Sequence, residues 1–260
     1  MAVGLLLLAA FAAGFIDAIA GGGGLITVPA LLATGLPASL VLGTNKGQAV
    51  FGSGASMISF WRAGRVDAGR APLAFVAGAI GSLAGASLVL LVSPSVLRPL
   101  VMVLLVSVAV FLTFRPPLPV GTPGKTAARP PLTARDPARA RRLGAILALV
   151  IGAYDGFFGP GTGTFLIITS VLVLGQSLTS ASADAKVVNF ASNLAAMVVF
   201  AASGTVVWAV SLPMAAAQFA GGWTGAKVAV RGGDHLVRWV VLGVVVALVG
   251  KLAVDAWQAG

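Results

Sequence analysis

One segment of this sequence occurs twice, and each copy combines a glycine-rich break with lone ionisable residues inside apolar runs. The first copy lies within residues 14–48 and the second within 152–186. Each contains an apolar helix with one Asp, a glycine break, a short apolar segment and a further helix with one Lys. Breaks and charges of this kind are costly in membrane-length segments unless they line a site. The duplication therefore predicts two halves of one transport pathway.

The two copies keep a fixed register. An offset of 138 residues pairs Asp17 with Asp155, and after a two-residue insertion an offset of 140 pairs Lys46 with Lys186. A register that pairs charged residues as well as glycines is hard to obtain by chance, so we interpret it as an internal repeat. The sequence predicts a first transmembrane repeat, a basic Pro-rich cytoplasmic linker and a second transmembrane repeat, at 1–114, 115–142 and 143–260.

The composition places both repeats in a membrane. The chain of 260 residues is 58% hydrophobic and 9% charged, whereas a soluble domain carries about 25% charged residues. The predicted fold class is therefore an all-α polytopic membrane protein. The chain has no Cys, no Glu and a single His, which is a thin inventory for acid–base or metal chemistry. We expect no enzymatic activity, no metal and no cofactor.

Each half contains five apolar elements, and the second is short in both. These second elements have about 12 residues, whereas a helix needs about 20 to cross a bilayer. Short helices at corresponding positions of two halves indicate a transporter's binding site. The expected elements are 2–20, 25–36, 39–61, 71–93 and 96–114 in the first half, and 143–158, 163–175, 179–202, 205–228 and 236–257 in the second.

The basic residues predict how the halves are oriented. Most Lys and Arg residues lie in three loops, at 62–70, 115–142 and 227–238, which is typical of cytoplasmic loops. The loop 62–70 carries three arginines, but its counterpart at 203–205 carries no charge. The halves are therefore expected to be inverted repeats, with the short element acting as a crossing partner. A re-entrant hairpin there would instead make the repeats parallel.

The net charge of +10 fits anionic lipids better than nucleic acid. The linker 115–142 is rich in Pro and basic residues, cannot bury apolar area and is expected to lie against lipid head groups at the cytoplasmic face. We therefore expect the bilayer as a partner and no nucleic acid, and this interpretation leaves room for a homo-oligomer.

Each glycine break ends one helix and opens another. The first turn of the following helix has unpaired N–H groups at the positive end of the helix dipole, which favours an anion. Close helix packing is the other explanation for such glycines. The break residues predicted to bind substrate are Gly22, Gly23, Gly24, Thr27, Gly161, Thr162, Gly163 and Thr164.

The lysines lie well inside the third element of each half. There a lysine either extends to the interface or meets an anion. The spacing of Lys186, Asn189 and Asn193 puts all three on one helical face, and such a stripe offers hydrogen-bond donors to an oxyanion. The predicted substrate-binding residues of these elements are Asn45, Lys46, Gln48, Lys186, Asn189 and Asn193.

Asp17 and Asp155 are the acidic residues of the two copies. They either pair with the lysines, balancing charge or carrying a coupled proton, or cap the broken helices. Asp184 precedes Lys186 by two residues and is expected near a helix start rather than in the pathway.

The motifs resemble a known family. The run from Gly14 to Pro29 with the following Gly43-Thr-Asn-Lys46 is similar to the sulfite exporter TauE/SafE family, and the second-half runs 159–164 and 185–189 resemble that family's repeat. The resemblance covers essentially the whole chain. It implies a multi-pass carrier of the bacterial inner membrane that exports sulfite, organosulfonates such as sulfoacetate, and related small anions.

The expected function is secondary transport by alternating access, with the anion bound at mid-membrane between the two glycine breaks. The chain has no nucleotide-binding motif, so the membrane potential or an ion gradient would supply the energy. A non-transporting membrane scaffold and a carrier working in the import direction are the alternatives.

Overall fold

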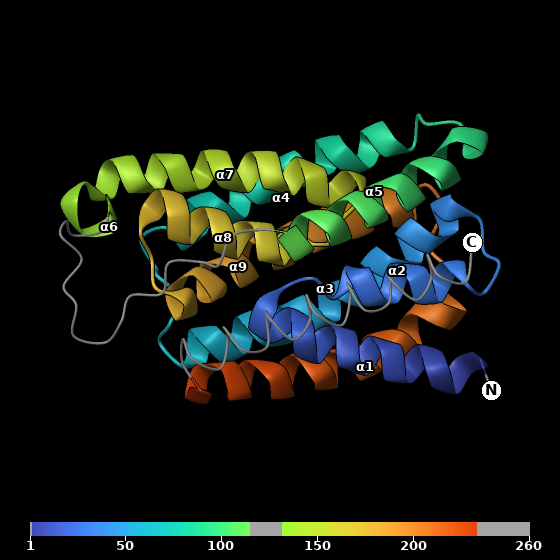
Figure 1. Cartoon of the computed structure of the whole chain (residues 1–260), viewed down its shortest axis with the longest axis horizontal. Coiled ribbons are helices and arrows are strands. Elements are labelled where there is room, and N and C mark those ends of the chain that lie inside the picture. The colour runs from blue at the N-terminus through green and yellow to red at the C-terminus, as the bar shows by residue number, and fades with distance from the viewer. Residues whose placement is uncertain (1, 115–131, 233–260) are drawn as a thin grey trace.

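The computed structural model describes residues 2–114 and 132–232, which are helical throughout apart from short connections (Figure 1). The first half contains α1 (Ala2–Ala20), α2 (Gly24–Leu32), α3 (Ala38–Arg62), α4 (Ala71–Val89) and α5 (Pro94–Phe114). The second contains α6 (Leu132–Arg135), α7 (Pro137–Phe157), α8 (Thr162–Leu174), α9 (Leu178–Ala202) and a helix over residues 208–232. The predicted element 236–257 and the linker residues 115–131 lie outside the described residues.

The predicted short elements are short helices. The helix α2 has nine residues and α8 has thirteen. By contrast, α7 begins at Pro137 rather than at the predicted residue 143. The side chain of Asp136 accepts a hydrogen bond from the N–H of Arg139 and caps this helix, and Pro137 fits its first turn. The end of the predicted linker is therefore the start of a helix.

The molecule carries apolar side chains outside and polar ones inside. Leucines and valines such as Leu5, Val103 and Val150 are more than half exposed, whereas both repeat lysines are buried. Within the described residues, four helices are long and apolar enough to cross a membrane: Val3–Ala20, Ala71–Val89, Pro94–Phe111 and Leu178–Ala202. An apolar exterior around a polar interior suits a multi-pass membrane protein.

Successive helices alternate in direction along the long axis of the molecule. In Figure 1, α1 runs leftward from the N-terminus and α2 returns to the right, so the short helix makes one reversal of direction. In the second half α7 runs rightward and α8 returns to the left. Equivalent helices of the two halves thus run in opposite directions in this view.

Glycines let equivalent helices of the two halves pack backbone to backbone. On α4, Gly81 lies so close to α7 that an added Cβ would clash with the carbonyl oxygen of Leu149. Its repeat equivalent Gly221 lies equally close to the carbonyl oxygen of Phe11 on α1. Leu149 and Phe11 are themselves equivalent positions, so the two interfaces are copies of each other. These glycines serve packing, as predicted.

Candidate functional site

The two glycine breaks, which are about 140 residues apart in the sequence, are in direct contact. An added Cβ at Gly21 would clash with the backbone of Gly163 and Thr164, and one at Gly24 would crowd Pro160. Gly21 has a φ of 77°, in the left-handed region that glycine adopts readily. Close packing and a polar site are therefore both features of these breaks, because the contact brings the first turns of α2 and α8 together.

Lys46 is buried between the two halves. Its Nζ lies 2.9 Å from Oδ2 of Asp155 on α7 and donates a hydrogen bond of 3.0 Å to Oδ1 of Asn193 on α9. The side chains of Lys46 and Asp155 are both only 3% exposed. The Asp155 carboxylate also accepts a hydrogen bond from the Ser192 hydroxyl. The lysine therefore points into the protein and does not extend to an interface.

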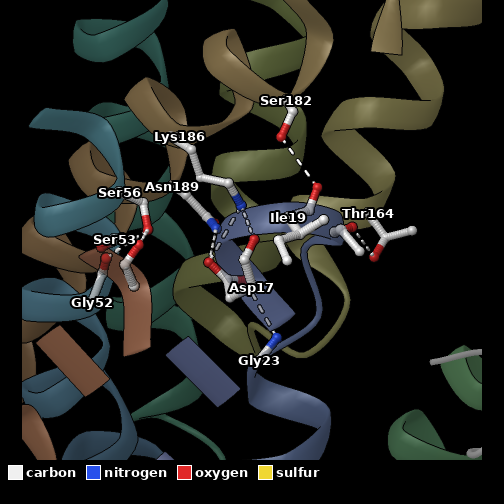
Figure 2. Close-up of polar contacts among 12 residues, drawn as sticks. Asp17, Ile19, Gly23, Gly52, Ser53, Ser56, Thr164, Ser182, Lys186 and Asn189 are labelled. Carbon is white, nitrogen blue, oxygen red and sulfur yellow. Dashed lines mark hydrogen bonds and ion pairs between the residues drawn. The ribbon is translucent and has the colours of Figure 1, made fainter. Parts of the chain in front are cut away.

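Lys186 makes the reciprocal contact with the first half. Its Nζ lies 3.4 Å from Oδ2 of Asp17 and also donates to the backbone carbonyl oxygen of that residue. The Asp17 carboxylate accepts two further hydrogen bonds of 3.3 Å, from the backbone N–H of Gly23 and from Nδ2 of Asn189. Figure 2 shows Asp17 between these donors. This aspartate both pairs with a lysine and satisfies an N–H group of the glycine break.

Each lysine thus binds the aspartate of the other half. The two ion pairs are equivalent under the repeat register, because the offset that relates Lys46 to Lys186 is accompanied by that relating Asp17 to Asp155. Removing either partner of a buried pair leaves an uncompensated charge, which costs about 3–5 kcal/mol. The crossed pairs therefore hold the halves together around one polar centre with two positive and two negative groups.

Polar side chains of α2 and α3 extend this centre. The hydroxyl of Thr27 donates a hydrogen bond of 2.6 Å to Oδ1 of Asn45, and Nε2 of Gln48 donates one of 3.3 Å to the same oxygen. All three side chains are buried. Two donors on one amide oxygen fix how the Asn45 amide is oriented, so this side chain is positioned before any ligand arrives.

A cavity of about 30 Å³ lies between the glycine breaks and the third helices. One water molecule needs roughly 10–15 Å³, so the cavity has room for about two. Most of the predicted residues line it. These are Asp17, Gly22, Gly23, Gly24, Thr27, Asn45, Lys46, Asp155, Thr162, Gly163, Asn189 and Asn193.

The remaining predicted residues are not part of the cavity lining. The hydroxyl of Thr164 donates to the carbonyl oxygen of Ala20 and ties the second break to the first. Gly161 has a φ of 86° and caps the start of α8. They support the lining residues from behind and do not reach the cavity. The predicted residues outside the lining are Gln48, Gly161, Thr164 and Lys186.

Gln218 is a lining residue that the sequence reasoning missed. It lies on the helix over 208–232, is 4% exposed, and its Oε1 has no hydrogen-bond partner among the described residues. Its side-chain stem lies against two glycines, Gly14 on α1 and Gly52 on α3, at which an added Cβ would clash. A search for matched pairs overlooks it because its repeat equivalent is Gly78. A glutamine inside an apolar span was the available signal.

Asp184 belongs to a different cluster. Its carboxylate lies 2.8 Å from Nη2 of Arg70, in the connection before α4, and accepts a hydrogen bond of 2.8 Å from Nε2 of Gln176. Asp184 does not line the cavity between the glycine breaks. As predicted, it lies near the start of a helix, where it links the two halves beside the arginine-rich loop.

The sequence matches the family described as sulfite exporter TauE/SafE over residues 6–252. It is 38% identical over 251 residues to a probable membrane transporter protein, ORF9, of Sinorhizobium, covering 96% of this chain and 92% of the relative. It is 35% identical over 250 residues to a probable membrane transporter protein of Haemophilus influenzae, covering 94% and 92%.

A third relative is the probable membrane transporter protein YfcA of Escherichia coli K12, which is 34% identical over 258 residues, covering 98% of this chain and 90% of the relative. No solved structure matches the chain.

Proposed function

The chain belongs to the sulfite exporter TauE/SafE family, and on that premise we propose that it exports small sulfur oxyanions across the bacterial inner membrane. Sulfite and organosulfonates such as sulfoacetate are the proposed substrates. One observation carries the proposal: lysines from two different halves are buried at one polar centre, where two glycine breaks meet. Buried cations at a break in membrane helices indicate a site for an anion.

The cavity offers the donors that a sulfur oxyanion needs. The ammonium group of Lys46 supplies charge, and the amides of Asn189 and Asn193 supply directional hydrogen bonds. The first turns of α2 and α8 add N–H groups at the positive ends of two helix dipoles. Charge-assisted hydrogen bonds are about twice as strong as neutral ones, so this set favours an anion over a neutral solute.

Alternating access follows from the relation between the halves. Equivalent helices run in opposite directions in Figure 1 and make copied contacts at Gly81 and Gly221. We interpret the halves as inverted repeats, in which each half adopts in turn the conformation of the other and opens the site to the opposite side. A negative cell interior favours anion exit by about 2.3 kcal/mol per charge per 100 mV.

Reconstituted transport tests the proposed function. Purified protein in liposomes is expected to release radiolabelled sulfite or sulfoacetate at a rate above that of protein-free liposomes, and faster when the interior is made negative. Labelled glycerol is the neutral control. No flux of either anion in either direction, from protein that remains folded and monodisperse, would identify a non-transporting scaffold. Flux that occurs only inward under every gradient would instead support the import alternative.

Gln218 is expected to orient the bound anion. Replacing it by leucine keeps the side-chain size but removes the amide, and one lost hydrogen bond to a charged group costs about 1.5–3 kcal/mol. We therefore expect Gln218→Leu to raise the KM for sulfite at least about tenfold. Gln218→Glu, which places a carboxylate at the cavity, should lower flux further.

Gln176→Leu is the matched control for this prediction. Gln176 is also buried and its Oε1 also lacks a partner among the described residues, but it lies at Asp184 and not at the cavity. Its replacement should leave KM unchanged. A KM for Gln218→Leu equal to that of the unmodified protein would remove this residue from the site.

A further inference from the structure

The aspartate of one crossed pair already occupies the position that an anion needs. Asp17 accepts from the backbone N–H of Gly23, from the Asn189 amide and from the Lys186 ammonium (Figure 2). A sulfur oxyanion bound at the first glycine break would use these same three donors. Before the anion binds, its place is therefore held by a carboxylate that belongs to the protein.

The charge balance makes simple addition of an anion unfavourable. The charged groups that face Asp17 are Lys186 on α9, Lys46 on α3 and Asp155 on α7, and with Asp17 itself they sum to zero. An added anion would leave this buried centre with net negative charge, and an unpaired buried charge is costly. The cavity of about 30 Å³ also has no room for both carboxylates and a four-atom oxyanion.

The two carboxylates are not equally easy to displace. Asp155 lies 2.9 Å from its lysine, accepts from Ser192 and is 3% exposed. Asp17 lies 3.4 Å from its lysine and is 14% exposed. The Asp17 carboxylate is therefore the more loosely paired and the more accessible of the two, although the repeat makes their positions equivalent.

We propose that the anion displaces the Asp17 carboxylate, which takes up a proton, so that anion and proton cross the membrane together. This rests on the proposed function and adds a second transported species to it. The balance is one proton bound by an Asp17 oxygen when the anion binds Lys186, and one proton released when the anion leaves on the other side. A dianion then carries one net negative charge, which the membrane potential still drives outward.

Simultaneous measurement of anion and proton flux tests the inference. Liposomes containing a pH-sensitive dye receive purified protein and an inward gradient of labelled sulfoacetate, chosen because its acidic groups stay ionised near neutral pH and carry no proton themselves. With the membrane potential clamped, the lumen is expected to acidify by about one proton per anion. Asp17→Asn should keep anion flux within about tenfold of normal while proton movement falls to the protein-free level.

Asp155→Asn separates coupling from a general structural effect. We expect this variant, which removes the tighter pair, to lose anion flux and proton flux together. Anion flux by the unmodified protein without proton movement would overturn the inference and leave the proposed function intact. Absence of anion flux would instead overturn the proposed function. An unchanged proton-to-anion ratio in Asp17→Asn would exclude Asp17 as the carrier, and that ratio in Asp17→Glu decides the question if Asp17→Asn does not fold.

Discussion

Replacing Lys186 by methionine is expected to lower sulfite transport by at least about 100-fold, the largest loss we expect from a single side chain. Lys186 is fully buried and contacts Asp17, beside which the anion is proposed to bind. Methionine fills a similar volume but supplies neither charge nor a donor. A lost charge-assisted hydrogen bond costs about 1.5–3 kcal/mol, and the absent counter-charge adds to this in a low-dielectric interior.

The single substitution also destabilises the fold, so transport must be compared at equal folding. Lys186→Met leaves Asp17 without its counter-ion, at a cost of about 3–5 kcal/mol. The double variant Lys186→Met with Asp17→Asn removes both charges and should recover most of the melting temperature in detergent, but it should not recover transport. Lys227→Met is the control, because Lys227 lies 5.2 Å from the centre of the Trp223 ring, away from the cavity. Normal transport by the folded double variant would show that Lys186 is structural.

The sequence was sufficient to predict the helical class, the repeat register and the short second helices. The fixed offset between Asp17 and Asp155 and between Lys46 and Lys186 required no structural information, and apolar length limited α2 and α8 to short helices. These features depend on spacing along the chain. The start of α7 was missed because its cap, Asp136, lies in a segment whose proline and arginine content suggested a flexible linker.

The pairing between the halves could not be predicted from spacing. The sequence allowed each lysine to extend to an interface or to meet an aspartate of its own half, and only the packing of α1 against α9 and of α3 against α7 and α9 brings Lys186 to Asp17 and Lys46 to Asp155. The difference between the two pairs, 2.9 Å against 3.4 Å, is likewise a product of packing. Gln218 was missed because the repeat pairs it with a glycine.

A side chain at the contact between the two glycine breaks is expected to prevent the halves from closing. At Gly21 an added Cβ would clash with the backbone of Thr164, which is held by the helix that follows and cannot move aside as a flexible side chain would. We therefore expect Gly21→Ala to abolish transport and to lower the melting temperature in detergent substantially, because the clash falls where α2 and α8 begin.

Gly35→Ala isolates that clash from the strain of the backbone. Gly21 and Gly35 have φ values of 77° and 82°, so alanine suffers about the same left-handed penalty of 1–2 kcal/mol at either position. Gly35, however, has open space around its Cβ position. The difference between the two variants therefore measures the contact alone: Gly35→Ala should remain folded and transport sulfite at close to the normal rate. Equal losses in both would mean that backbone strain explains the glycine at 21, and that the proximity of the two breaks is not required for transport.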